Sequence, residues 1–95
     1  MNATYILHSK KLNKFYVGAT QDSIESRIEK HNNHEYGLHR FSAKADDWEL
    51  FLLIPTEDYA HAIRIERKIK AMKSAKFILK LKDNNDLREW LVSSS

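Results

Sequence analysis

The sequence contains no cysteine, one proline and two glycines among its 95 residues. Without cysteine the chain forms neither disulfides nor thiolate metal sites, and cysteine content does not indicate whether its compartment is oxidising or reducing. Long apolar runs are also lacking: the longest, residues 50–54 (LFLLI), is far shorter than the roughly 20 residues that a membrane-spanning helix needs. Because the N-terminus shows no apolar signal-peptide region either, we expect by default a cytoplasmic protein that does not enter a membrane.

Hydrophobic residues nevertheless make up 42% of the chain, which favours a folded protein over a disordered one. A chain of this length holds one modest core rather than two. We therefore expect a single domain over residues 1–95, with its core between about residues 4 and 81 and a C-terminal helix at about residues 84–92.

The net charge of +3 is unevenly distributed along the chain. Residues 64–82 contain eight Lys or Arg and one acidic residue, Glu66, a local balance of +7, whereas residues 1–63 balance to −2. Such a basic segment is suited to phosphate contacts, which dominate the affinity of proteins for nucleic acids. A solvated helix face would give the same pattern, and charge alone does not decide between the two interpretations.

Runs of apolar and β-branched residues predict three strands, at about residues 3–8, 14–20 and 48–54. The third run is apolar at nearly every position, so we expect both of its faces to be covered. The polar segment 32–47 lacks a sustained period and is expected to be a long irregular connection, which in a small domain is usually functional.

Helical patterns follow the second and the third strand. The first predicted helix begins at residue 22 or 23, with Asp22 and Glu25 as a capping pair, and ends near Asn32. The next begins after Pro55, has Glu57 and Asp58 in its first turn, and runs to about residue 73. Two shorter helices complete the chain: Ser74 caps one, and the other carries Leu87, Trp90 and Leu91.

Tyr5 and Tyr16 lie on the first two predicted strands, and Gly18 leaves a gap in the second. If the turn at residues 10–13 has an even length, Tyr5 pairs with Gly18 and the two tyrosine rings share a face beside that gap. The gap would then be a pocket. An odd turn would place the rings on opposite faces, and a tyrosine in a strand usually serves packing alone.

Arg27 and His31 are one helical turn apart and can share a face. The forked guanidinium of Arg27 suits phosphate, although a surface ion pair with a neighbouring glutamate is the ordinary role for such an arginine. His31 is near the predicted helix end, where a histidine commonly interacts with the last carbonyl groups instead of taking part in catalysis.

Glu66 is on the apolar side of its predicted helix, between Ile63 and Ile69. A carboxylate in that position is costly unless it is paired or binds a metal. An i,i+4 pair with Lys70 is the alternative, but such a pair contributes only about 0.2–0.5 kcal/mol and does not explain a carboxylate among isoleucines. We therefore favour a functional role for Glu66.

These residues, taken in order, resemble the GIY-YIG nuclease domain, in particular its small stand-alone bacterial members. The triplets ATY (residues 3–5) and YVG (residues 16–18) take the places of the two motif triplets, and Arg27 and Glu66 follow on helices. The similarity extends over about residues 4–81. No single motif is specific, whereas the ordered set is much more so. The chain departs from the pattern with Ala and Thr in place of the first Gly and Ile, and with Val in place of the second Ile.

The resemblance implies an α/β (α+β) fold in which a three-stranded antiparallel sheet is flanked by helices. It also implies a metal-dependent endonuclease that hydrolyses phosphodiester bonds in DNA, and a lone domain of this kind is expected to act on branched or damaged structures in repair or recombination. Mg²⁺ (or Mn²⁺) is the implied cofactor, with Glu66 as its ligand. The implied catalytic residues are Tyr5, Tyr16, Arg27, His31 and Glu66.

For DNA contacts we expect the basic segment and the irregular connection to contribute Arg40, Lys44, Arg67, Lys70 and Lys73. Tyr16 is our first choice as the general base because it adjoins Gly18, although the sequence does not decide between the two tyrosines. The alternative function is a nucleic-acid-binding module of the same fold with little or no catalysis.

Overall fold

The computed structural model describes residues 1–35 and 41–95 of the chain. Three strands form one antiparallel sheet in the order β2-β1-β3, with β1 at Ala3–Ser9, β2 at Lys14–Thr20 and β3 at Glu49–Pro55. The α-helices of the described part are α1 (Ile24–Asn32), α2 (Tyr59–Met72), α3 (Ala75–Asp83) and α4 (Asn85–Ser93). The expected three-stranded antiparallel sheet with flanking helices is confirmed.

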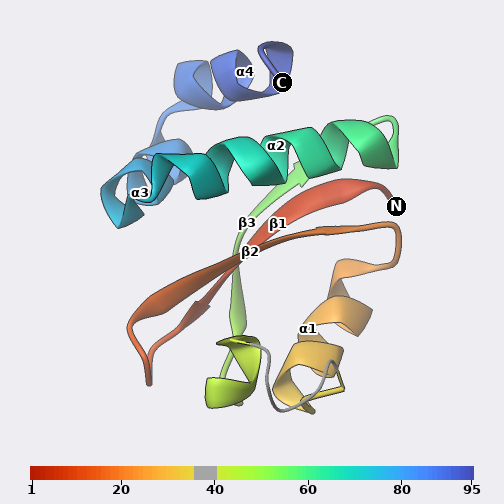
Figure 1. Cartoon of the computed structure of the whole chain (residues 1–95), viewed down its shortest axis with the longest axis vertical. Helices are drawn as coiled ribbons and strands as arrows, with labels where there is room; N and C mark the ends of the chain where they lie inside the picture. The colour runs from red at the N-terminus through yellow and green to blue at the C-terminus, as the bar shows by residue number, and fades with distance from the viewer. Residues whose placement is uncertain (36–40) are drawn as a thin grey trace.

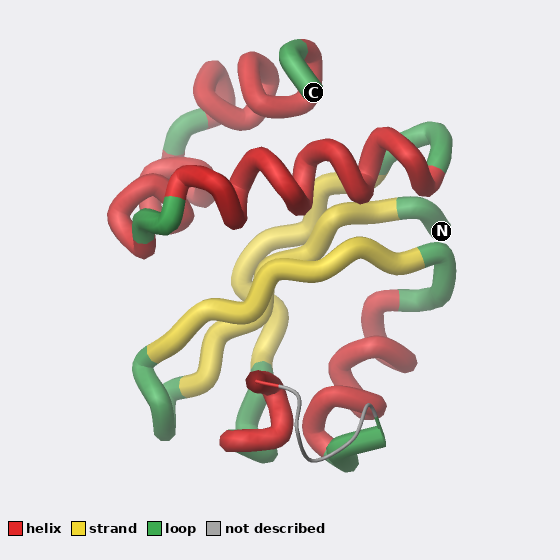
Figure 2. The backbone as a smooth tube through the Cα atoms, in the orientation of Figure 1, coloured by secondary structure: helices red, strands yellow, loops and turns green. Residues whose placement is uncertain are grey.

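Helices cover the sheet from both sides: α2, α3 and α4 lie on one side and α1 on the other (Figure 1). The same three layers are visible with the strands drawn as yellow tubes between red helices (Figure 2). Because side chains alternate between the faces of a strand, Ile6 packs with α2, α3 and α4, whereas Tyr5 and Leu7 pack with Ile24 of α1. The sheet therefore separates two small cores, which corrects the expectation of one modest core, because both faces of the sheet are covered by helices.

The helix starts differ by a few residues from the sequence prediction. Ser23, and not the pair Asp22 and Glu25, caps α1, because its side chain accepts a hydrogen bond from the Ser26 N–H. Asp58 caps α2 by accepting from the His61 N–H, so Glu57 and Asp58 precede the first turn instead of forming it. Ser74 caps α3, as predicted.

The prediction for the third strand was wrong at its ends and in its burial. Trp48 precedes β3 and is buried, whereas Pro55 is the last residue of the strand. The faces of β3 are covered along only part of the strand. Glu49 and Leu50 are exposed, and Ile54 is the buried residue of the strand. The exposed residues are at the start of the strand, so an apolar run here does not show that both faces are covered along its whole length.

The connection between α1 and β3 contains a 3₁₀ helix, η1 (Phe41–Lys44), which the sequence prediction of an irregular segment missed. Asp47 then ties this connection to the β1–β2 turn: its carboxylate accepts hydrogen bonds from the Ser9 hydroxyl at 2.6 Å and from the Lys11 main-chain N–H at 3.0 Å. These two bonds, the Ser9 bond first, hold the pKa of Asp47 below its usual value of 3.8.

In the described part of the chain, no helix is both long enough and apolar enough to cross a membrane.

Candidate active site

The β1–β2 register is the one that an even turn predicts. Tyr5 pairs with Gly18 and Leu7 pairs with Tyr16, so both tyrosines point to the α1 side of the sheet. Their ring centroids are 6.3 Å apart. The prediction that the two rings share a face is confirmed.

The space beside Gly18 is filled and is not a pocket, which corrects the sequence interpretation. A Cβ atom added to Gly18 would lie 2.5 Å from the Tyr5 hydroxyl oxygen and 2.6 Å from the ring carbon that carries it. Since the tyrosine ring lies directly over the glycine, the missing side chain gives room to the motif tyrosine of the neighbouring strand.

Tyr5 is held firmly in this position. Its side chain is fully buried, and a hydrogen bond of 2.8 Å joins its hydroxyl to Nε2 of His31, which is only 1% exposed. His31 is therefore not a helix-capping residue facing solvent: it belongs to the interior of the site. A buried polar atom without a partner is costly, so the hydrogen bond between these two side chains offsets the cost of burying both of them.

Tyr16 is different, because it is only partly buried. Its ring packs at 4.5 Å from the His31 ring and edge-on at 6.2 Å from the Trp48 ring, measured between centroids. The two tyrosines thus have distinct environments: Tyr5 is enclosed, whereas Tyr16 sits at the boundary between the core and solvent.

Arg27 extends from α1 across the same cluster to strand β2. Its guanidinium carbon lies 5.9 Å from the centre of the Tyr5 ring, and Nη2 donates a hydrogen bond of 3.5 Å to the carbonyl oxygen of Ala19. The side chain is half-buried, and an arginine is always charged. A fixed positive charge is thereby placed at the free edge of the sheet.

The C-terminal end of α1, which carries His31, is fastened by a contact that the sequence analysis missed. Asn32 Nδ2 donates to the Trp48 carbonyl, and the Trp48 N–H donates to Asn32 Oδ1, at 3.1 and 2.7 Å. This reciprocal pair holds the end of α1 against the start of β3. The only sequence signal was the position of Asn32 directly after His31, which is not specific.

Glu66 does not join this cluster, because α2 packs on the opposite face of the sheet (Figure 1). Its side chain is 19% exposed, and its carboxylate forms an ion pair of 2.7 Å with Lys70, the i,i+4 alternative considered for the sequence. The buried stripe of α2 consists of Ala62, Ile65 and Ile69, so Glu66 flanks that stripe and is not enclosed by it.

Helix α2, which carries Glu66, nevertheless packs against the same hairpin that Arg27 contacts. Thr4 of β1 donates from its hydroxyl to the Ala62 carbonyl of α2 at 2.6 Å, and Ile69 of α2 lines a pocket together with Val17 of β2. Arg27 reaches Ala19 from one face of the sheet, whereas Glu66 belongs to the helix on the other face.

The donor set limits what kind of metal site this chain offers. Within residues 1–35 and 41–95 no group of three or more His, Cys, Asp or Glu side chains is arranged to hold a metal ion. A single half-buried carboxylate suits Mg²⁺, which commonly binds through one or two carboxylates and keeps several waters or substrate phosphate oxygens as further ligands. Glu66 fits that mode and does not fit a closed metal cage.

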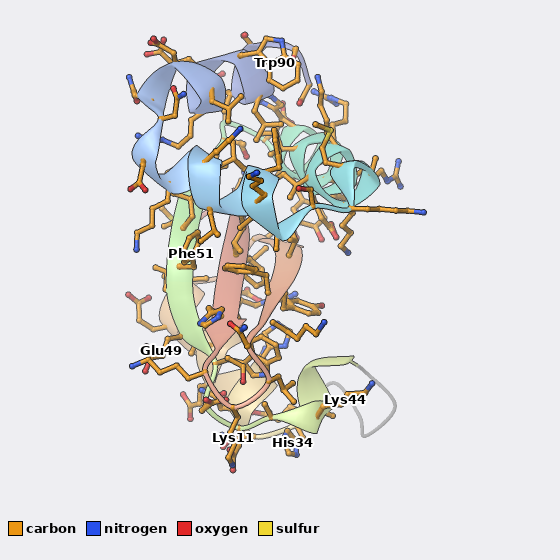
Figure 3. The ribbon with its side chains drawn as sticks, turned by 90° about the vertical axis from the view of Figure 1, so that its left-hand side faces the viewer. Lys11, His34, Lys44, Glu49, Phe51 and Trp90 are labelled. Carbon is orange, nitrogen blue, oxygen red and sulfur yellow. The ribbon has the colours of Figure 1, made fainter. Side chains whose placement is uncertain are left out.

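The expected DNA-contacting residues lie on both sides of the sheet. Lys44 is exposed at the α1 end of the molecule, at the opposite end from Trp90 of α4 (Figure 3). Arg67, Lys70 and Lys73 are exposed on the α2 side, and Arg40 lies outside the described residues.

The basic segment 64–82 is not one continuous stripe. Lys68 donates to Ser94 at 2.5 Å and lies over the Trp90 ring, and Lys82 lies over the Phe51 ring. These two lysines point away from the pocket that Lys70 and Lys73 line. Only part of the +7 balance is therefore available to a single ligand surface.

Comparison with known proteins agrees with this arrangement. The family model described as the GIY-YIG catalytic domain matches residues 1–80 of the chain. Searches of curated proteins and of solved structures found no match. GIY-YIG domains are nucleases that act on nucleic acid and generally use divalent metal ions. With the family model covering most of its length and the motif tyrosines, arginine and histidine gathered on one face of the β1–β2 hairpin, the chain belongs to the GIY-YIG family of nuclease domains.

Proposed function

We propose that this protein is a metal-dependent endonuclease that hydrolyses phosphodiester bonds in DNA. The observation that carries the proposal is the unequal environment of the two motif tyrosines. Tyr5 is enclosed and hydrogen-bonded to His31, whereas Tyr16 is accessible beside them on the same face. A site built only for packing has no need to fix one tyrosine rigidly and leave its neighbour open to water.

In this proposal Tyr16 acts in its deprotonated form: the phenolate oxygen accepts the proton of the attacking water and becomes a neutral phenol. Tyr5 and His31 act as a rigid support, because both are buried and bonded to each other, and they keep the Tyr16 ring in one orientation. Positioning of this kind matters, because misplacing a reacting group by about 1 Å can lower a rate by about 100-fold.

Arg27 binds the phosphoryl oxygens at the edge of β2, where its charge compensates the negative charge that develops during hydrolysis. Its guanidinium is already fixed there by the Ala19 carbonyl. Little reorganisation is then needed when the phosphate arrives.

Glu66 would hold the divalent cation through its carboxylate, with water and phosphate oxygens completing the coordination. When bound, such a cation neutralises the phosphate and stabilises the leaving oxygen. Lys70 must give up its 2.7 Å ion pair for this to happen, and an i,i+4 pair with an exposed lysine opposes the exchange by only about 0.2–0.5 kcal/mol.

The second candidate is a binding module of the same fold with little catalysis. It is favoured by one observation, namely that Lys70 already neutralises the carboxylate of Glu66. A protein that uses Glu66 only as a structural partner would show the same ion pair.

A cleavage assay with labelled duplex, single-stranded and branched DNA, in Mg²⁺ or in EDTA, separates the two functions. We expect Mg²⁺-dependent cleavage that falls by orders of magnitude in Glu66→Gln, while DNA binding in EDTA persists. Glu57→Gln, at an exposed glutamate just before α2, is the matched control and should cleave normally. Binding without cleavage in either Mg²⁺ or Mn²⁺ would favour the module, and a fully active Glu66→Gln protein would remove the metal assignment.

A further inference from the structure

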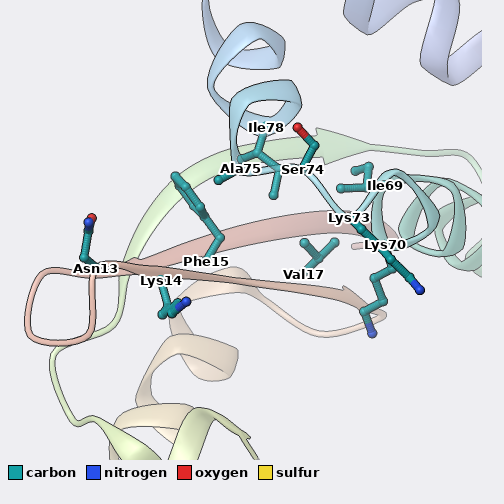
Figure 4. A pocket seen from close by; sticks show the side chains of 10 residues that line it. All are labelled: Asn13, Lys14, Phe15, Val17, Ile69, Lys70, Lys73, Ser74, Ala75 and Ile78. Atoms are coloured by element: carbon teal, nitrogen blue, oxygen red, sulfur yellow. The ribbon is translucent and has the colours of Figure 1, made fainter.

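A pocket of about 240 Å³ lies on the face of the sheet opposite the two tyrosines, between β2 and the junction of α2 with α3 (Figure 4). Its apolar lining comes from Val17 of β2, Ile69 of α2 and Ile78 of α3, and the aromatic ring of Phe15 forms part of the wall. None of the roles proposed above for the catalytic residues uses this pocket.

The pocket has the dimensions of a small aromatic ring system. A cavity of about 150 Å³ with an apolar lining is enough to bind one benzene ring. The volume here is larger by more than half, and the Phe15 ring offers a surface on which a flat heterocycle can stack.

The rim of the pocket is positively charged. Lys14, Lys70 and Lys73 line it, and among the described residues no acidic side chain does, although Lys70 is paired with Glu66. In Figure 4 Lys70 and Lys73 lie together at one side of the pocket and Lys14 lies below Phe15. An apolar interior with a basic rim is complementary to a ligand with a flat ring and flanking negative groups.

The free edge of β2, beside the pocket, also presents polar main-chain groups. Along a strand, the main-chain N–H and C=O groups of successive residues point alternately to the two neighbouring strands. Because the Thr56 N–H donates to the Asn2 carbonyl, residues 2, 4 and 6 face β3, and residues 3, 5 and 7 face β2. Tyr5 and Leu7 therefore form main-chain hydrogen bonds with Gly18 and Tyr16. It follows that Phe15 and Val17 direct their N–H and C=O groups to the free edge, as Ala19 does toward Arg27. These groups can pair with the edge of a heterocycle.

We propose that this pocket receives one unpaired nucleobase of the DNA, while the phosphates on either side of it lie on the three lysines. The inference rests on the proposed function and names the class of substrate: DNA with at least one base outside the duplex stack. Lys70 connects the two sites, since it lines the pocket and also contacts Glu66. A base held here places the neighbouring backbone beside Lys70 and its partner Glu66. Fully paired DNA is a poorer ligand, because a base must first be unstacked.

The test compares two DNA duplexes in EDTA, where no cleavage occurs. Both contain a one-nucleotide bulge, and in one of them the bulged nucleotide lacks its base. We expect the protein to bind the bulge with a base about tenfold more tightly, as expected for one base stacked on an aromatic side chain. Ala75→Phe, a substitution at an exposed residue of the pocket lining, should fill the pocket and abolish the difference.

Phe15→Ala should also remove the preference, and Phe77→Ala is its matched control. Phe77 is a partly buried phenylalanine of the same core that does not line the pocket, so its truncation should leave the tenfold preference intact. Melting curves for all variants show whether each one is folded.

Two results would overturn the proposal, and they are distinguishable. Equal affinity for the two bulges, or an Ala75→Phe protein that keeps the preference, would show that the pocket does not take a base, even where Mg²⁺-dependent cleavage is observed. Absence of DNA binding at 50 mM salt would overturn the proposed function and this inference together.

Discussion

The ring of Tyr5 on the neighbouring strand, and not a special backbone conformation, explains why residue 18 is a glycine. A Cβ atom there would lie within 3 Å of two atoms of Tyr5, so even alanine must displace the ring that contacts His31. We expect Gly18→Ala to lower the free energy of unfolding by about 1–3 kcal/mol, the usual cost of overpacking, and to reduce cleavage sharply. Urea denaturation measures the first effect.

A double-mutant cycle tests this cause. In a Tyr5→Ala background the ring is gone, so adding Gly18→Ala should cost little or nothing more. The same cost in both backgrounds would mean that Gly18 serves strand geometry and that the ring contact is incidental.

The two tyrosines should respond differently to loss of the hydroxyl. Tyr5→Phe removes the buried hydrogen bond between its hydroxyl and Nε2 of His31 and should cost about 1–3 kcal/mol of stability. Tyr16→Phe should leave the melting temperature nearly unchanged and lower kcat by about 100-fold or more, as expected for loss of a general base. If Tyr16→Phe cleaves at the parent rate, Tyr16 is not the base.

Among the secondary-structure elements, the hairpin was the most predictable from sequence and β3 the least. The positions of Tyr5, Tyr16 and Gly18 determine a register as soon as the turn length is even, because side chains alternate along a strand. The apolar run before Pro55 could not reveal that β3 is at the sheet edge, since that depends on the strand order β2-β1-β3. Nor could local sequence show that the Asn32 side chain forms hydrogen bonds with the main chain of Trp48, which is 16 residues away.

The link between the β1–β2 turn and the segment before β3 should depend on pH. Hydrogen bonds from Ser9 and Lys11 lower the pKa of Asp47 in the folded state, so below its usual value near 3.8 the unfolded chain binds more protons than the folded one. The stability from Asp47 is therefore present at neutral pH and is lost as the pH falls through the lowered pKa.

Asp47→Asn should accordingly be less stable than the parent at pH 7, and the difference should shrink as the pH falls below about 4. Urea denaturation at several pH values measures it. Asp83→Asn, at an exposed aspartate ending α3, is the control and should show no comparable pH-dependent gap. A constant difference at every pH would contradict the assignment.

At the scale of the whole molecule, the sheet divides the proposed chemistry between two faces that meet at the edge of β2. The tyrosines, Arg27 and His31 lie with α1, whereas Glu66 and the base pocket lie with α2. The sequence predicted the tyrosines, Arg27, His31 and Glu66 through the family resemblance, but it did not predict the pocket. It could not predict that they occupy opposite faces, because that depends on which side of the sheet each helix packs.

The same division predicts which basic residues bind DNA. Arg67 and Lys73 are exposed on the α2 side, whereas Lys68, in the same segment, is bonded to Ser94 and covers Trp90. On duplex DNA each neutralised phosphate adds about 0.9 to the slope of log affinity against log salt. Arg67→Ala and Lys73→Ala should each lower that slope by about this amount, and Lys68→Ala should leave it unchanged. Titrations of labelled DNA at several salt concentrations in EDTA measure the three slopes. Equal losses in all three variants would mean that DNA responds to the total charge of the segment and not to the surface that the fold presents.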